Sequence, residues 1–500
     1  MRRNEGGIAL VLCILALMVL TGIAVGLLYM TDAETSINSN YRSSQQAYFA
    51  ALAGVQSVRE RMTLSNVAPH LITGPTTMPG GAASVMYVVN PASNSDTVTL
   101  PIITGTGSYA DNELCTELTA QNVGCTQPST SYALLSEDPP SYGGASTVPA
   151  MGQLNYKWVR ITAKANAATA PYYANGSASG GGVQPNTQIC WDDRFVEVPV
   201  TTLGLANCSA GGSGSNPPSQ TPVYQLTSLA FTPSGASRML QMEVAQDPPL
   251  TTRGAVDSQD SVNLNGKLTI DGYDYCTCSC TTDNKGVTTC TNRAGQVCDG
   301  SKYAIYASGT VDPPKPSETF ASGQTPAVVQ NQPWPWDLTA LVNRFSPGAV
   351  AVTGSPYNWS CTGGNCGTQS NVTLGTLPAS GPPLSPVSPS DAGYQITYVP
   401  GNVQISGSNS QGFGVLVVNG NLDIHGGFTF DGLIIVTGVI SFTGGGSTGV
   451  NITGGVIAGQ QSLVDNTLGG SITINYDFCA LPQPDKTKPP RVLALRELNF

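Results

Sequence analysis

Residues 6–30 read GGIALVLCILALMVLTGIAVGLLYM, and no charged side chain occurs from Ile8 to Met30. A helix rises about 1.5 Å per residue, so this run is long enough to cross the roughly 30 Å hydrocarbon layer of a bilayer. It is longer than the apolar region of a signal peptide, about 7–15 residues, and no small-x-small cleavage site follows it. The run therefore predicts a membrane-spanning helix rather than a shed signal peptide.

The charges on the two sides of the apolar run differ in sign. Arg2 and Arg3 precede it, whereas Asp32 and Glu34 follow it. Because positive residues stay on the cytoplasmic side of a membrane, we expect a single pass with a cytoplasmic N-terminus and export of the remaining chain.

The helical pattern continues past the apolar run. Between residues 37 and 62 there is no proline, and the only glycine is Gly54. Apolar side chains recur every seven positions on one stripe of an amphipathic helix, at Tyr41, Tyr48, Val55 and Met62. We therefore predict one helix over residues 8–62, whose second half packs on a globular region. The simpler alternative is a single-pass anchor with a short stalk.

Composition excludes some protein classes. Only 10% of the residues are charged, the net charge is −10, and no large basic block occurs, so nucleic acid is not an expected partner. The 57 glycines and 36 prolines indicate short strands and many turns. With 500 residues, the chain is long enough for several domains.

Cysteine usage indicates an oxidising compartment. Of the 13 cysteines, Cys13 lies in the apolar run, and the others are Cys115, Cys125, Cys190, Cys208, Cys276, Cys278, Cys280, Cys290, Cys298, Cys361, Cys366 and Cys479. An even set outside the membrane favours a disulfide framework. Close spacing suggests the pairs Cys115–Cys125, Cys190–Cys208 and Cys361–Cys366. The cluster 276–298 holds an odd number of cysteines, so we expect one of them to pair with Cys479; the sequence does not say which.

Residues 63–252 read as strands and loops. β-like runs occur at 84–89, 96–103, 155–165 and 195–203. Strands at 223–232 and 237–245 with a turn at 233–235 predict a hairpin. Two stretches rich in glycine, serine and proline, 174–187 and 209–221, indicate exposed loops.

From residue 253 onward, short apolar runs repeat. VLVV at 415–418 is followed by LIIV at 433–436, and the run at 422–424 is followed at the same offset by the run at 440–442. The run at 428–430 is followed, at a slightly larger offset, by the run at 450–452. Such a repeat of about 18–22 residues is typical of a β-solenoid, which we predict over 253–480, with 262–272 as a separate first coil. A β-sandwich with glycine-rich hairpins is the alternative.

An insert, residues 276–395, interrupts this region. It contains the cysteine cluster, a short helix predicted within 334–345 and a linker rich in proline and serine at 376–393. Residues 481–500 form a tail that ends in a strand-like RVLAL. Trp334, Trp336 and Trp359 of the insert either contact a surface or glycan ligand or pack against the solenoid.

The residues do not predict an enzyme. The two histidines, His70 and His425, lie outside any nucleophile-elbow context. No lysine or arginine occurs between Arg344 and Lys486, which disfavours a carbohydrate-active β-helix. Asp423 and His425 share one side of a strand, where we expect a solvated face. Because an exported cysteine cluster favours disulfides over zinc, no metal, cofactor or catalytic residue is predicted.

The first 55 or so residues resemble the PilX-type N-terminal family of type IV pilus assembly proteins, within the type IV pilin class. In that family a basic leader ending in glycine precedes the apolar helix, which is followed by glutamate, arginine and an A-E-A-G-I-like block. Glu34, Arg42 and residues 51–55 match that order, although Leu52 stands where the family usually has glutamate. The resemblance implies cleavage by prepilin peptidase between Gly7 and Ile8, with cleavage after Gly6 as the lesser option.

The resemblance also implies a role. Major pilins carry glutamate at the fifth mature position, which here is Leu12, or Val11 if cleavage follows Gly6, and no carboxylate occurs between Ile8 and Asp32. This lack is shared by minor pilins and by the tip pseudopilin of type II secretion. We therefore expect a minor pilin-like subunit in the bacterial inner membrane, which contacts other pilin subunits through its N-terminal helix. A type II secretion pseudopilin and a membrane-anchored carbohydrate-active β-helix are the alternatives.

The expected fold class is α+β. The domains would be a leader (1–7), the transmembrane and amphipathic helix (8–62), a pilin-like antiparallel β head (63–252), the β-solenoid-like region with its disulfide-rich insert (253–480) and a tail (481–500).

Overall fold

The computed structural model describes residues 6–63, 72, 74–75, 78, 84–89, 107, 109–124, 132–136, 156–167, 184–193, 195–201, 207–208, 220–283, 287–444, 449–460, 465–483 and 488–498. The predicted strand 96–103, His70 and Cys125 lie outside these residues, as does most of the predicted leader.

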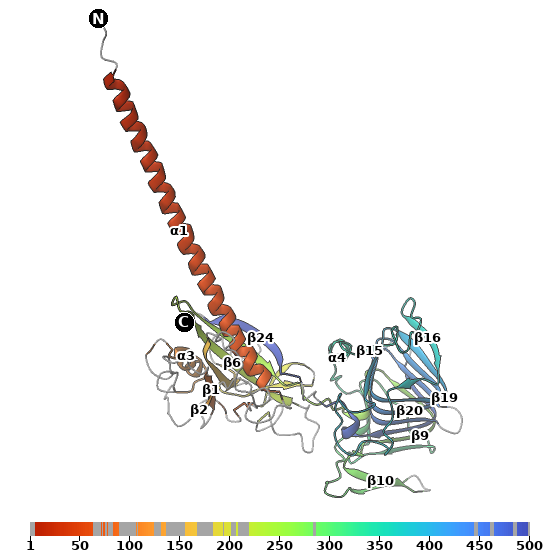
Figure 1. The fold of residues 1–500 in the computed structure, drawn as a ribbon. Coiled ribbons are helices and arrows are strands. Elements are labelled where there is room, and N and C mark those ends of the chain that lie inside the picture. Colours follow the sequence, from red (N-terminus) through yellow and green to blue (C-terminus); the bar gives the residue numbers. More distant parts are fainter. Residues whose placement is uncertain are drawn as a thin grey trace, which may run out of the picture. The chain divides into compact units, whose positions relative to one another are not determined.

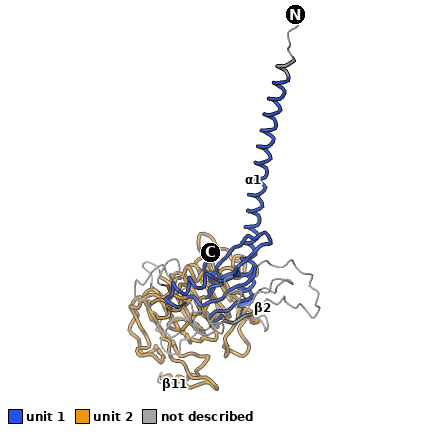
Figure 2. The backbone as a smooth tube through the Cα atoms, turned by 90° about the vertical axis from the view of Figure 1, so that its left-hand side faces the viewer, with its two compact units in different colours: residues 1–164, 224–244, 492–500 blue, residues 165–223, 245–491 orange. Residues whose placement is uncertain are grey.

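The fold is α+β, with one long N-terminal helix and a mostly β remainder. The chain forms two compact units, which Figure 2 colours separately. Unit 1 comprises residues 1–164, 224–244 and 492–500, and unit 2 comprises 165–223 and 245–491. This division differs from the predicted boundary at 252 because the chain leaves unit 1 twice and returns to it twice.

Helix α1 runs without interruption from Gly6 to Arg61, and its last turns lie against the sheet of unit 1 (Figure 1). Ala47, Ala51, Val55 and Val58 are fully buried there, at the spacing of one helical face. The predicted seven-residue stripe is only partly buried, since Tyr41 is 65% exposed. A straight helix drifts by about 20° per seven residues, so such a stripe leaves the buried face along its length.

The sheet of unit 1 has the strand order β2–β1–β3–β6–β7–β24. The bounds are β1 (Val85–Val89), β2 (Tyr132–Ser136), β3 (Tyr156–Ala163), β6 (Gln220–Phe231), β7 (Ser237–Ala245) and β24 (Arg491–Leu498). β6 and β7 form the predicted hairpin, whose turn places Gly235 at φ 89°. The predicted tail supplies β24, which pairs with β7 although most of unit 2 lies between the two strands along the chain.

A short helix, α3 (Asn112–Ala120), was not predicted. It begins at Asp111, whose carboxylate accepts a hydrogen bond from the Leu114 N–H at 3.1 Å. The Asp111 carboxylate also accepts from Arg160 of β3 at 2.8 and 2.7 Å and from the Tyr87 hydroxyl at 2.9 Å, and the second guanidinium nitrogen of Arg160 contacts Glu117 at 2.6 Å. This fully buried ion network joins α3 to the sheet, and burial is the main reason that the pKa of Glu117 is raised.

Unit 2 is built on a sheet of 14 strands among its described residues, all paired in parallel. Its members are β8 (Gly254–Ser258), β9 (Val262–Asp271), β12 (Tyr303–Ala307), β13 (Glu318–Ala321), β14 (Val328–Val329), β15 (Val350–Ala351), β16 (Asn365–Ser370), β17 (Thr373–Leu374), β18 (Gln395–Val399), β19 (Asn402–Val418), β20 (Leu422–Val436), β21 (Ile440–Gly444), β22 (Val450–Ala458) and β23 (Asn466–Tyr476). Outside it lie β4 (Ile189–Asp192), β5 (Glu197–Pro199), α4 (Leu338–Phe345) and a hairpin of β10 (Cys278–Thr282) and β11 (Thr288–Asn292).

The register of the parallel strands follows the repeats in the sequence. Val415 pairs with Leu433 and Leu422 pairs with Ile440, which confirms the shorter of the two offsets. Phe428 pairs with Val450, which confirms the longer offset. These apolar residues are buried in one continuous core, in which each row of strands covers the next.

Glycine occupies the same sharp bend in three neighbouring strands of this sheet. Gly414, Gly432 and Gly454 pair with one another and have φ values of 120°, 143° and 140°. A Cβ atom on Gly432 would lie 1.9 Å from the carbonyl oxygen of Gly414, so no other residue fits. Asn466 serves another corner: it is buried, accepts from the Ile440 N–H at 2.7 Å and donates to Ser258 at 2.8 Å.

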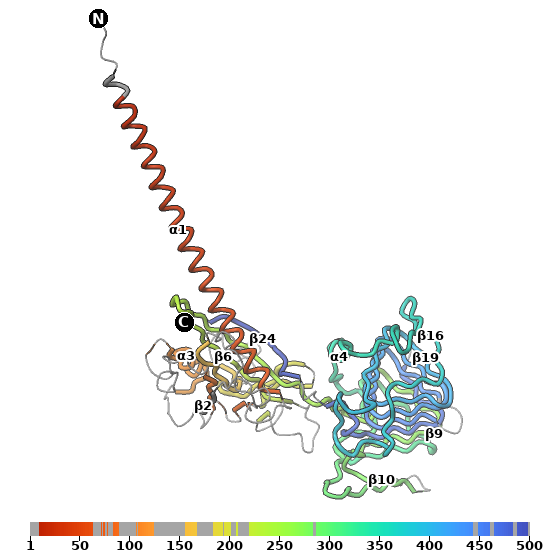
Figure 3. Tube along the Cα trace, viewed as in Figure 1, coloured from red at the N-terminus to blue at the C-terminus, as the bar shows by residue number. Residues whose placement is uncertain are grey.

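The earliest strands of this sheet pair with its latest strands. Strand β8 pairs with β22, and β9 pairs with β23 along its whole length, so green and blue segments lie side by side in Figure 3. β12 and β13 continue the stack beyond β8 and β9, and β18 continues it beyond β19. Residues 276–395 are therefore not a simple insert, because they supply strands to both ends of the stack.

Candidate functional site

The most unusual surface of the molecule is the first half of helix α1. From Leu10 to Met30, every large apolar side chain is between 49% and 76% exposed. An apolar surface of this length is stable in lipid or against other apolar helices, and unfavourable in water. Among the described residues, α1 is the one helix long and apolar enough to span a membrane, which is compatible with single-pass anchoring.

The threonine hydroxyls in and just beyond this segment have partners within the helix. The Thr21 hydroxyl donates to the Leu17 carbonyl at 2.8 Å, and the Thr31 hydroxyl donates to the Leu27 carbonyl at 2.9 Å. Thr35 bonds to the Thr31 carbonyl in the same way. The helix therefore presents no unsatisfied hydroxyl to the hydrocarbon at these positions.

The predicted processing residues lie at the start of this helix. Gly7 and Ile8 have helical backbone in the first turn of α1, and the side chain of Ile8 is not among the described parts of the chain. Leu12, at the position where major pilins are expected to carry glutamate, is 62% exposed. An uncharged side chain there offers an apolar contact and no ion pair.

The second half of α1 is fastened to unit 1 by close packing. Gly54 faces β3 and β6, where a Cβ atom would lie 2.7 Å from Ser228 Oγ and 2.9 Å from Tyr156 Cγ. Leu52 packs against the apolar core beside it. At the rim, Arg238 of β7 donates to Ser44 Oγ of the helix at 3.1 Å.

Five disulfides join the described cysteines: Cys190–Cys208, Cys276–Cys479, Cys278–Cys298, Cys280–Cys290 and Cys361–Cys366. Cys115 is also disulfide-bonded, and its expected partner, Cys125, lies outside the described residues. Cys13 has a free thiol on the exposed helix. The sulfur atoms near Asp271 and Asp477 are all in disulfides, so these groups offer no thiolate to a metal ion.

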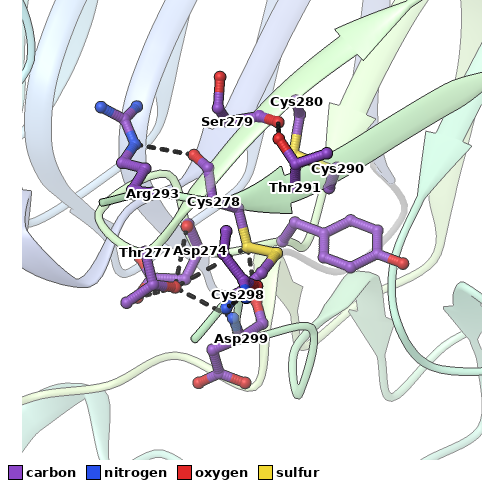
Figure 4. The surroundings of a disulfide bond; sticks show 12 residues. Asp274, Thr277, Cys278, Ser279, Cys280, Cys290, Thr291, Arg293, Cys298 and Asp299 are labelled. Carbon is purple, nitrogen blue, oxygen red and sulfur yellow. Dashed lines mark hydrogen bonds between the residues drawn. A yellow bond between two sulfur atoms is a disulfide. The ribbon is translucent and has the colours of Figure 1, made fainter. Parts of the chain in front are cut away.

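The cysteine cluster forms the hairpin β10–β11 (Figure 4). Cys280 and Cys290 face each other across the two strands, and Cys278 is bonded to Cys298 beyond the hairpin. The Arg293 Nε donates to the Cys278 carbonyl at 2.9 Å, and the Asp299 N–H donates to Thr277 at 3.0 Å. The disulfides and these hydrogen bonds at the foot of the hairpin hold a ribbon whose side chains are otherwise largely exposed.

The tryptophans of residues 276–395 pack against the stack. Trp336 is 5% exposed, and its Nε1 donates to Asp257 Oδ2 at 2.7 Å. The guanidinium of Arg253 lies over its ring at 5.2 Å. Trp334 and Trp359 are partly buried against the same core. Trp336 is thus a structural residue, and the prediction that it contacts a surface or glycan ligand is wrong.

Asp423 and His425 lie on the outward side of β20, as expected from their spacing. Their side chains are 36% and 48% exposed, and His425 Nε2 lies 2.7 Å from Asp423 Oδ2. Gln404 on the neighbouring strand donates to the same oxygen at 3.3 Å and accepts from Thr368 at 2.6 Å. These residues form one row of an outward polar face rather than a cleft.

Buried ionisable groups of unit 2 also have structural partners. Burial raises the pKa of Asp257 to about 6, although this carboxylate accepts from the N–H groups of Arg253 and Gly254. Burial likewise raises the pKa of Asp477 to about 8. A pocket of about 600 Å³ lies elsewhere in unit 2, between Val311 and Gln330, and its wall is mostly proline and apolar side chains. It does not include either carboxylate.

Comparison with known proteins adds little. No family model matches the chain, and no curated protein matches it. The competence-associated pilin ComZ from Thermus thermophilus, a solved structure, is 12% identical over 55% of this chain and 81% of that chain, with a TM-score of 0.15. A TM-score at this level does not establish a shared fold.

Proposed function

We propose that this protein is a minor pilin-like structural subunit of type IV pilus assembly. The observation that carries the proposal is helix α1, which is exposed and apolar in its first half and packed on a β sheet in its second half. Such a helix serves first as an inner-membrane anchor and then as the contact with other pilin helices. Leu12 in place of glutamate supports an initiating or tip-like position rather than the bulk of a filament.

The same proposal gives each unit a role. The sheet of unit 1 would be the pilin-like head, and the parallel stack of unit 2 would be a β-solenoid that the head displays outside the inner membrane. Disulfides support export, because they persist in oxidising compartments. The outward row through Gln404 and Asp423 would face a surface or glycan ligand of an adhesive module.

Processing by prepilin peptidase is the direct test. The full chain is coexpressed with the peptidase in a bacterial host, and its intact mass is measured after membrane extraction. We expect a mature chain that begins at Ile8, and we expect Gly7→Val to block cleavage while Gly6→Val is cleaved. An uncut chain, or one cut near residue 31, would exclude the proposal.

The alternative function that the same helix would serve is that of a type II secretion pseudopilin. Deletion of the gene in its own host separates the two: loss of surface pili supports pilus assembly, whereas loss of a secreted enzyme with intact pili supports the secretion system. Photo-crosslinking from position 12 of the helix identifies the neighbouring subunits directly.

A further inference from the structure

The hairpin β10–β11 is ordered without an apolar core of its own. A two-stranded ribbon is at best marginally stable in water, and most side chains of this one are exposed threonine, serine or asparagine. The disulfides Cys280–Cys290 and Cys278–Cys298 lie within it or at its base, and Cys276–Cys479 fixes the segment just before it. Disulfide bonds therefore hold the ribbon in place. Because the ribbon is already ordered, pairing with a further strand costs it little conformational entropy.

The ladder shows which main-chain groups face outward. The Arg293 N–H bonds to the Thr277 carbonyl, and the Asp283 N–H bonds to the Val287 carbonyl. Hydrogen-bonded and non-bonded pairs alternate in an antiparallel ladder, so the pairs formed by Cys280 with Cys290 and by Thr282 with Thr288 turn their N–H and C=O groups away from the ribbon.

The outer edge of β11 is the more open of the two. On β10, the Cys278 N–H already donates to the Asp274 carbonyl at 2.7 Å, and its carbonyl accepts from Arg293. On β11, the outward main-chain groups of Thr288, Cys290 and Asn292 have no partner within the described part of the chain. Three alternate residues thus present a complete edge for a further strand.

This edge lacks the features that protect sheet edges elsewhere in the molecule. Proteins block edges with proline, charge or a bulge. At one end of the stack, Pro313, Pro314 and Pro326 flank the short β13, and at the other end β16 has a register shift. Strands β10 and β11 contain no proline and no charged residue, and their register is continuous.

We infer that the outer edge of β11 pairs, antiparallel and about a two-fold axis, with the same edge of a second copy of this chain. Centred on Cys290, the register sets Thr288 of each copy opposite Asn292 of the other, so each of the outward pairs exchanges two main-chain hydrogen bonds. No like charges meet along the strands. Beyond them, Arg293 of one copy lies opposite Val287 of the other, whose N–H group donates to the Asp283 carboxylate, so the charges near this end of the pair are opposite.

The test uses the full chain in detergent, with the oligomeric state measured over a range of concentrations. Thr288→Pro removes an outward N–H from the β11 edge, and Thr282→Pro removes the matching one from β10; neither N–H donates within the ribbon. We expect dimers for wild type and T282P, and at least about tenfold weaker dimerisation for T288P, since several main-chain hydrogen bonds are lost. Peptide mapping of the Cys280–Cys290 disulfide shows that both variants retain the hairpin.

A photo-crosslinker at position 289 provides a second readout. The proposed register sets this position opposite Thr291 of the other copy, so crosslinked peptides should join two segments around residue 290. A monomeric wild-type chain, equal effects of T288P and T282P, or crosslinks to a different segment would each overturn the inference. None of these results depends on whether the helix enters a pilus.

Discussion

Cys276 and Cys479 are joined by a disulfide, although 203 residues separate them in the chain. Cys276 follows strand β9, and Cys479 follows strand β23. These two strands pair directly, from Val262 with Asn466 to Asp271 with Asn475. The bond therefore fixes covalently the junction at which an early strand of unit 2 pairs with a late one.

Removing this bond should destabilise unit 2 more than removing a local one. In the chain-entropy description, stabilisation grows with loop length, to about 5 kcal/mol for a loop of this size and about 2 kcal/mol for a very short loop. We expect the double variant C276S/C479S to lower the unfolding temperature more than C361S/C366S, whose cysteines are only 5 apart. Thermal unfolding of the full chain in detergent measures the difference, and equal shifts would contradict the role of the junction.

Gly54 should be required for the packing of α1 on unit 1. In Gly54→Ala, the new methyl group meets Ser228 and Tyr156 at less than 3 Å, and overpacking of this kind costs about 1–3 kcal/mol. Gly26→Ala is the matched control on the same helix, because nothing lies within 4 Å of its Cβ position. Limited proteolysis of the unit 1 sheet should accelerate in the first variant alone.

Arg160 should be indispensable to unit 1. Arg160→Met leaves Asp111 and Glu117 buried without their shared cation, and breaking a buried pair in this way costs about 3–5 kcal/mol. Arg238→Met removes an ion pair with Glu497 in which both side chains are 41% exposed, together with the hydrogen bond to Ser44, so its cost should be smaller, at about 1–2 kcal/mol. Denaturant unfolding compares them, and similar costs would show that the network is not a stabilising element.

Asp477 should make the stability of unit 2 depend on pH. Burial, and then the nearby Asp274, raise its pKa to about 8 in the folded protein, against about 3.9 in an unfolded chain. The folded state therefore binds more protons between these values, and stability falls as pH rises through this window. Asp477→Asn keeps an acceptor for the Cys479 and Ala480 N–H groups but does not ionise.

The variant should differ from wild type in the slope of stability against pH from about pH 4 to about pH 8, and most clearly above pH 6. Burial raises the pKa values of Asp257, Asp271 and Asp431 to about 6. Their contribution to the pH dependence of stability therefore falls mainly below pH 6, and it is present in both proteins. Unfolding temperatures measured at intervals of pH should decline less steeply in Asp477→Asn. Two parallel curves from pH 6 to pH 8 would show that this carboxylate is ionised at little cost.

Local signals in the sequence predicted the elements well where one period dominates. An uninterrupted helix without proline is expected from residues 8–62 and is observed from Gly6 to Arg61. The hairpin β6–β7 also follows from alternation and a turn. The short α3 was missed because two leucines four apart are a weak helical signal, and its stability depends on the ion network with Arg160.

Repeats predicted the register of strands that are close in the chain, but not which distant strands pair. Both predicted offsets are found between β19, β20, β21 and β22. No repeat spacing indicates that β9 lies on β23 or that β24 returns to β7. These contacts join segments that are far apart along the chain, and nothing in either local segment encodes its distant partner.

The sequence by itself determined the apolar helix, the period of the parallel strands and the even set of cysteines outside the apolar run. These depend on hydrophobic periodicity, glycine at tight corners and residue type, which are properties of neighbouring residues. Only the tertiary structure decided that residues 276–395 extend both ends of the stack, that Cys276 is the partner of Cys479 and that Trp336 is buried on Asp257. Each of these results depends on which surfaces pack against each other in the folded chain. Such packing joins residues that are far apart in the sequence, so no local segment specifies it.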